Sequence, residues 1–205
     1  MTLTLYTNPM SRGRIARWML EEIGQPYQVE YLGYDGAMKA PAYRAINPMG
    51  KVPALVHGRR TVTEVAAICA YLADAFPQAG LAPVPDDRAD YYRWLFFAAG
   101  PLEQAVVNQA LGVQVPQDRR GMVGYDTLET TLDAVDQMLQ GRDYVTGQFS
   151  AADVYLGSHL AWGMQFGAIP ARPAFQAYVA RGMARPALAR ANAADDAAMA
   201  AMQKG

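Results

Sequence analysis

The sequence has one cysteine, Cys69, among its 205 residues. A single thiol cannot form an intramolecular disulfide or a cysteine-based metal cluster. Such a low cysteine content is typical of proteins that work in a reducing compartment. The two histidines, His57 and His159, are not at a spacing typical of metal ligands. We therefore expect a cytoplasmic protein that holds no metal ion.

The sequence also lacks an excess of charge of either sign. Its 18 Lys and Arg residues nearly balance its 19 Asp and Glu residues, whereas proteins that bind nucleic acids usually carry a basic excess. It contains no run of 18 apolar residues that could span a membrane. Its N-terminal segment lacks the basic and apolar regions of a signal peptide. These absences argue against nucleic-acid and membrane partners, while a hydrophobic fraction of 52% is sufficient for a packed core.

The first 76 residues predict an α+β layer. Apolar residues at helical spacing after Ser11 indicate a helix that ends at Gly24. Thr63 is in a position to cap a second helix, from Glu64 to about Phe76. The order strand, helix, strand predicts a parallel pair with a right-handed crossover, followed by a hairpin. Strands are indicated by alternating residues rich in β-formers over 2–6, 27–32 and 52–56.

The remainder of the chain predicts helices. Residues 77–87 hold three prolines and one glycine without hydrophobic periodicity, which is typical of a linker between domains. Pro101 predicts a kink in a long helical stretch. Ser150 and Asp153 have the spacing of a capping box, which predicts the start of a buried helix. The expected organisation is an N-terminal domain over 1–77, a linker over 78–87 and an all-helical domain over 88–205.

Four segments of the chain carry a family pattern: LYTNPMSRGRIARWMLEE, INPMGKVPALV, TVTEVAAICAYLADAFP and FSAADVYLGSHLAWGM. Together they resemble the bacterial cytosolic glutathione transferases, of a serine-type or nu/theta-like class. The resemblance covers the whole chain and implies a thioredoxin-like α+β domain followed by an all-α domain. It also implies a homodimeric detoxification enzyme that uses glutathione as co-substrate and needs no cofactor.

Pro53 lies inside a predicted strand, where it cannot donate a hydrogen bond to a neighbouring strand. A cis peptide bond between Val52 and Pro53 would turn the backbone of Val52 outward, so that it could pair with an extended peptide. The resembled family uses this residue for the cysteinyl part of glutathione. The alternative is an ordinary proline in an edge strand, but the flanking sequence INPMGK favours ligand binding.

Glu64 opens a predicted helix, whose unpaired N–H groups and partial positive charge suit a carboxylate. By resemblance, the γ-glutamyl carboxylate of glutathione would lie at this helix start, and the Glu64 side chain would bind the γ-glutamyl amine. The family usually has serine at the next position, whereas this chain has Val65, which leaves only a backbone contact. Alone, Glu64 could simply stabilise the helix dipole. In the family pattern Glu64 occurs together with Val52 and Pro53, and this combination favours a role in glutathione binding.

Lys39 and Lys51 are two of only three lysines, the third being Lys204. Related transferases use lysines at matching places to bind the glycyl carboxylate of glutathione. The resemblance therefore implies that role for both residues. The alternative for each is a solvated lysine on the surface.

Transfer of glutathione needs its thiolate, which is the nucleophile. A donor near a helix N-terminus lowers the pKa of a thiol by binding the charged form. We favour Ser11 as this donor, with Tyr6 and Asn8 as alternates, although Ser11 could instead serve as a helix cap. The loop has no cysteine of its own, and Cys69 is expected in the core.

The predicted function is glutathione S-transferase activity, in which the bound thiolate attacks a small hydrophobic electrophile. The alternatives are a glutathione-dependent peroxidase, dehalogenase, isomerase or ether lyase, and a non-catalytic binding module of the same fold. The second substrate is expected in a pocket at a domain interface. Two or three members of one apolar set are expected to line it: Tyr91, Trp94, Leu95, Phe97, Leu102, Trp162, Met164 and Phe166.

Overall fold

The computed structural model describes residues 2–203 of the chain. These residues form two compact units. The first comprises the chain up to Leu81 together with the segment from Ala184 onward, and the second comprises Ala82–Met183. Within the described residues, no helix combines the length and the hydropathy needed to cross a membrane.

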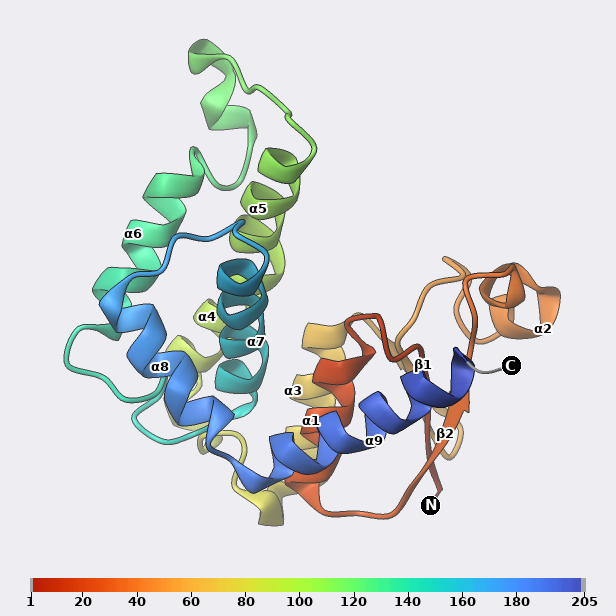
Figure 1. Ribbon diagram of the computed structural model, residues 1–205. Coiled ribbons are helices and arrows are strands. Elements are labelled where there is room, and N and C mark those ends of the chain that lie inside the picture. Colours follow the sequence, from red (N-terminus) through yellow and green to blue (C-terminus); the bar gives the residue numbers. More distant parts are fainter. Residues whose placement is uncertain (1, 204–205) are drawn as a thin grey trace. The chain divides into compact units, whose positions relative to one another are not determined.

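The first unit contains a four-stranded sheet, part of which is labelled in Figure 1. Its strands are β1 (Leu3–Thr7), β2 (Tyr27–Tyr31), β3 (Ala54–His57) and β4 (Arg60–Thr63). The strand order is β2-β1-β3-β4, with β1 parallel to β2 and the other two pairs antiparallel. The parallel pair and the hairpin that follows it confirm the predicted α+β arrangement.

Helices of the first unit pack on this sheet and on one another. Alternate residues of β1 are buried, as expected for a strand with one face against the core. Residues Ile15, Trp18, Met19 and Ile23 form a buried helical stripe, and Gly24, with a φ of 65°, ends that helix as predicted. The helices are α1 (Gly13–Ile23), α2 (Pro41–Arg44), α3 (Val65–Ala75) and α9 (Pro186–Met202), with a 3₁₀ turn at Ala37–Lys39.

The last helix, α9, packs along α1 in the first unit (Figure 1). The sequence pattern had grouped this segment with the all-helical domain, because periodicity identifies a helix but not the element against which it packs. The domain limits at residues 77 and 88 stay a prediction. Four ion pairs join the two helical segments: Arg14–Asp196, Arg17–Asp195, Glu21–Arg190 and Glu22–Arg185.

The second unit is helical, as predicted. The kink expected at Pro101 takes the form of a π-helical segment, Ala98–Leu102, between two helices. The wider turn accommodates a residue that has no N–H to donate. The helices are α4 (Ala89–Phe97), α5 (Glu103–Ala110), α6 (Leu128–Leu139), α7 (Ala151–Gln165) and α8 (Pro173–Met183).

The capping box at the start of α7 is confirmed. The amide and the hydroxyl of Ser150 both donate to Oδ2 of Asp153, each at 2.8 Å. Oδ1 of Asp153 accepts from the Val145 amide and the Tyr178 hydroxyl, also at 2.8 Å each. Burial raises the pKa of the Asp153 carboxyl, while these hydrogen bonds act in the opposite direction. This carboxylate therefore joins three segments of the second unit.

Candidate functional site

The last residues of β1 and β4 lie beside the first residue of β3 at one end of the sheet. Tyr6 in β1 lies opposite Ala54 in β3, and Ala54 lies opposite Thr63 in β4. Since neighbouring strands are about 4.8 Å apart, Tyr6 and Thr63 are about 10 Å apart across the sheet. The loop after β1, the segment before β3 and the start of α3 all leave the sheet from this end. The fold thus brings together three of the groups predicted from the sequence.

The segment before β3 presents the backbone of Val52. The Val52–Pro53 peptide bond is cis, as predicted. The carbonyl of the preceding Lys51 accepts from the Tyr43 hydroxyl (2.7 Å) and from Nδ2 of Asn47 (2.8 Å). Within residues 2–203, neither the amide nor the carbonyl of half-buried Val52 has a hydrogen-bond partner. This backbone is held by its neighbours, yet it can still pair with an extended peptide.

Glu64 joins β4 to α3 in a conformation that L-residues rarely adopt. Its φ is 65° and its ψ is 119°, and such strain is typical of functional sites. Glu64 is exposed and is the N-cap of α3, without a side-chain hydrogen bond to the helix. The prediction that Thr63 caps this helix is therefore wrong, because Thr63 ends β4. The first amides of α3, starting with that of buried Val65, have no intrahelical partner and suit a carboxylate.

The two candidate lysines differ in how the structure holds them. Nζ of Lys39 donates to the carbonyls of Met49 (3.1 Å) and Gly50 (2.7 Å). This contact braces the segment that leads to Val52. Lys51 is exposed and directly precedes Val52. Lys39 is exposed as well, and the binding of a ligand carboxylate by either lysine stays a prediction.

The loop after β1 is organised by Asn8. Nδ2 of Asn8 donates to the carbonyl of Leu32 (2.8 Å), and its Oδ1 accepts from the amide of Met10 (2.9 Å). The residue is 0% exposed. Its side chain thus shapes the loop, and its role as an alternate thiol donor stays a prediction.

Ser11 lies half-buried at the end of this loop. Its hydroxyl donates to the carbonyl of Asn8 (2.7 Å) and accepts from the amide of Gly13 (3.0 Å), the first residue of α1. Because serine has one hydroxyl proton, donation to a thiolate would replace the bond to Asn8. The contact with Gly13 resembles a helix cap, so both roles considered for Ser11 from the sequence are compatible with its position.

Tyr6 and Thr7 occupy opposite faces of the end of β1. The Tyr6 ring lies 5.7 Å from that of Tyr43, centroid to centroid. Thr7 is fully buried, and within the described part of the chain its Oγ1 has no hydrogen-bond partner. A side chain at position 13 would collide with this Oγ1. Tyr43 and Asn47, which brace the Lys51 carbonyl, have no local sequence signal that could have identified them.

The remaining sequence candidates separate into core and surface. Cys69 lies in the core as predicted, and burial raises the pKa of its thiol to about 12. Residues 2–203 contain no group of three or more His, Cys, Asp or Glu that could hold a metal ion. Of the apolar set proposed for the second substrate, four members are core residues: Tyr91, Trp94, Leu95 and Leu102. The other four are partly or fully exposed: Phe97, Trp162, Met164 and Phe166.

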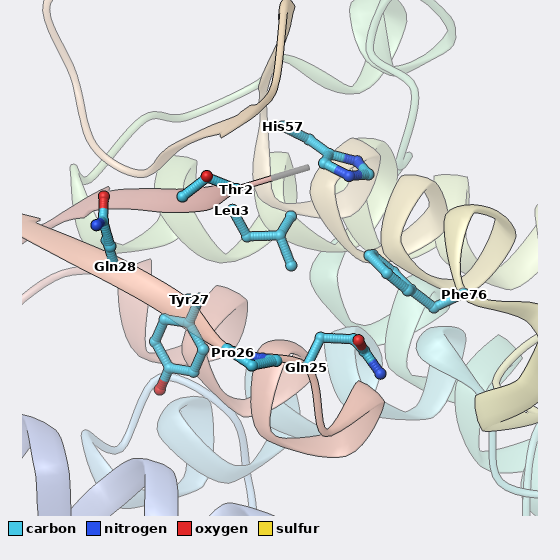
Figure 2. Close-up of a pocket in the computed structure, with 8 residues that line it drawn as sticks. All are labelled: Thr2, Leu3, Gln25, Pro26, Tyr27, Gln28, His57 and Phe76. Atoms are coloured by element: carbon cyan, nitrogen blue, oxygen red, sulfur yellow. The ribbon is translucent and has the colours of Figure 1, made fainter.

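The opposite end of the sheet carries a separate hollow of about 560 Å³. Figure 2 shows Leu3, Tyr27, His57 and Phe76 among the side chains that line it. His57 lies opposite Leu3 in the β1–β3 pair, three residues along β3 from Ala54. The hollow is therefore not part of the site that contains Val52 and Glu64.

Comparison with known proteins places the chain in a family. A family model described as the glutathione S-transferase N-terminal domain matches residues 10–75. This range includes α1, the Val52–Pro53 segment and Glu64. The chain is 31% identical over 179 residues to glutathione S-transferase GST-4.5 of Xanthomonas campestris, which covers 80% of this chain and 84% of that protein.

Solved structures give the same result. A sphingomonad glutathione S-transferase complexed with glutathione has 30% identity and a TM-score of 0.76, covering 94% of this chain and 98% of that one. A theta-class enzyme from Xanthomonas axonopodis pv. citri with glutathione bound has 31% identity and a TM-score of 0.74, covering 92% and 96%. These similarities confirm the predicted fold and the predicted enzyme class, and the chain belongs to the glutathione S-transferase family.

Proposed function

We propose that the protein binds glutathione at this end of the sheet and transfers it, as a thiolate, to a small hydrophobic electrophile. The proposal is carried by the convergence of an unpaired backbone at Val52 with an exposed carboxylate, Glu64, at the start of α3. The Val52 backbone can pair with the backbone of a peptide, and the Glu64 carboxylate can bind an ammonium group. The start of α3 can bind a carboxylate. Glutathione carries all three complementary groups in one short molecule.

The placement of the tripeptide follows from these contacts. Its cysteinyl residue pairs with the Val52 backbone, its γ-glutamyl amine binds Glu64, and its γ-glutamyl carboxylate accepts from the first amides of α3, including that of Val65. The glycyl carboxylate at the other end needs a cation. Lys51 is exposed beside Val52 and supplies that charge, while Lys39 supports the loop behind it.

The thiol of the cysteinyl residue then points to β1, which neighbours β3 in the sheet. Ser11 donates its hydroxyl proton to the sulfur in place of the Asn8 carbonyl, and the start of α1 adds partial positive charge. Tyr6 is the alternative donor. Because such contacts stabilise the charged form, they lower the thiol pKa. The thiol proton passes to solvent, sulfur forms a bond to an electrophilic carbon, and the leaving group departs with its electron pair.

Calorimetric titration and a turnover assay test this proposal. The protein should bind glutathione, and it should bind cysteinylglycine more weakly, because that dipeptide lacks the γ-glutamyl amine and carboxylate. With glutathione present, a chlorinated nitrobenzene should lose chloride. Absence of glutathione binding at millimolar concentration would contradict the proposal. Binding without turnover of several electrophiles would instead favour a non-catalytic binding module.

We also propose that the protein is a cytoplasmic homodimer. The apolar side chains Tyr92 and Phe96 are 41% and 66% exposed on α4, and their rings lie 6.5 Å apart. Exposed apolar patches of this kind are typical of protein interfaces. Light scattering should give twice the chain mass of 22.3 kDa. A single chain mass at micromolar concentration would contradict the dimer.

A further inference from the structure

Arg14, in the first turn of α1, links the loop before that helix to the last helix of the chain. Its Nε donates to the carbonyl of Pro9 (2.6 Å), and its Nη2 donates to Oδ1 of Asp196 in α9 (2.6 Å). The Arg14 side chain is 21% exposed and that of Asp196 is 61% exposed. Pro9 lies inside the loop that carries Ser11. The Asp196 carboxylate on α9 therefore binds the Arg14 guanidinium, which in turn binds the backbone of this loop at Pro9.

The position of α9 does not depend on Asp196 alone. Arg185, directly before α9, binds Glu22 through two hydrogen bonds (2.6 and 2.8 Å). Arg17 and Asp195 form a pair at 2.9 Å in which both side chains are buried. These contacts, spaced along α1, hold the helix in place. Asp196 is thus presented to Arg14 by an element that is anchored independently.

The guanidinium needs this second partner to stay on the Pro9 carbonyl. An arginine side chain loses much rotamer freedom when it is fixed, and one hydrogen bond to a carbonyl offsets that loss only in part. A carboxylate at 2.6 Å on the other side of the planar group adds a charge-assisted contact. The other hydrogen bonds of the loop lie within it, as from Met10 and Ser11 to Asn8, or join it to the carbonyl of Leu32 and to the start of α1. The contact that ties the loop to α9 is the one made by Arg14.

We propose that Asp196 is a positioning residue for thiol activation. By fixing Arg14 on the Pro9 carbonyl, it holds the loop, and with it the Ser11 hydroxyl, in the arrangement that meets the thiol of glutathione. Its catalytic consequence rests on the function proposed above, whereas the tether itself is a property of the protein without ligand.

The test compares Asp196→Ala with Arg190→Ala in the full chain. Each variant replaces an exposed α9 partner of an α1–α9 ion pair with the best helix-forming residue. Arg190 pairs with Glu21 at 2.9 Å, away from the loop, so it is a matched control. Hydrogen exchange of a peptide covering residues 8–14 should become about two- to five-fold faster in Asp196→Ala, the range expected from losing one exposed ion pair. It should be unchanged in Arg190→Ala.

Kinetics provide the second measurement. Asp196→Ala should lower kcat near neutral pH by about two- to five-fold and move the pH–rate profile to higher pH, with little change in KM for glutathione. Asp196→Asn keeps an oxygen acceptor and should restore part of the loss. Equal exchange rates and equal pH profiles in the two alanine variants would overturn the inference. Faster exchange in both would also overturn it, because the docking of α9 as a whole would then hold the loop.

The two proposals fail in different ways. If the wild-type protein does not bind glutathione, the proposed function fails, and with it the catalytic role of Asp196. The exchange comparison then still decides whether Asp196 tethers the loop. If the wild-type protein turns over substrate and Asp196→Ala matches Arg190→Ala in both measurements, only the inference about Asp196 fails.

Discussion

Replacing Glu64 tests whether its strained backbone is kept for the ligand. The φ of 65° and ψ of 119° cost a residue with a Cβ about 1–3 kcal/mol. Glycine avoids that cost but loses about 0.5–1 kcal/mol more backbone entropy on folding. Glu64→Gly should therefore be about 0.5–2 kcal/mol more stable than Glu64→Ala, both of which lack the carboxylate. Each kcal/mol corresponds to about 2–4 °C in Tm for a chain of this size.

Glutathione affinity should fall in every Glu64 variant, including the one with the more stable fold. Glu64→Gly, Glu64→Ala and Glu64→Gln all lose the charged partner of the γ-glutamyl amine. Since a charged hydrogen bond contributes about 1.5–3 kcal/mol, glutathione affinity should fall about ten-fold or more in each. Urea unfolding gives the stabilities and calorimetry gives the affinities. The reasoning is refuted if Glu64→Gly is no more stable than Glu64→Ala, or if Glu64→Gln binds glutathione as the wild type does.

Three further predictions concern the fold around the site and the second unit. Asp153→Ala should cost about 3–5 kcal/mol in urea unfolding, because it leaves buried donors without their acceptor. Ser150→Ala should cost only about 0.5–2 kcal/mol, and equal losses would contradict this account of the capping box. The Cys69 thiol, its pKa raised from 9.0 to about 12, should resist a thiol reagent in the native protein. Because the folded state retains a proton that the unfolded state loses, stability should fall above pH 9 by about 1.4 kcal/mol per pH unit. Cys69→Ala should lack that component, and a rapid native reaction with the reagent would contradict the burial. Gly13→Ala should destabilise the protein by about 1–3 kcal/mol through its collision with Thr7. Adding Thr7→Ala should recover much of this loss, and the absence of any recovery would show that the collision is not the cause.

Features with a local signal were predictable from the sequence. The alternating strands, the stop at Gly24, the cis bond before Pro53 and the capping box of Ser150 and Asp153 are all present. Each depends on residues within a few positions of one another, so one stretch of sequence contains the whole pattern. The predicted order of strand, helix, strand and hairpin is also present.

Features that depend on distant residues were not predictable. The cap expected at Thr63 is wrong because the strand pairing of β4 extends through that residue. The hydrogen bond from the Asn8 amide group to the carbonyl of Leu32 joins residues 24 positions apart, so the loop sequence alone gives no sign of it. The partner of α9 is set by ion pairs between residues more than 160 positions apart, such as Arg185 and Glu22. No pattern within a short window contains these contacts.

The central claim is that the protein binds glutathione and lowers the pKa of its thiol. Titration of the enzyme–glutathione complex, followed by the ultraviolet absorbance of the thiolate, measures this most directly. The bound thiol should titrate well below the value of about 8.5 that is usual for a cysteine thiol. Ser11→Ala should raise the pKa of the bound thiol without abolishing binding, whereas Tyr6→Phe should leave it in place. A bound thiol that titrates as it does in free glutathione would contradict the account.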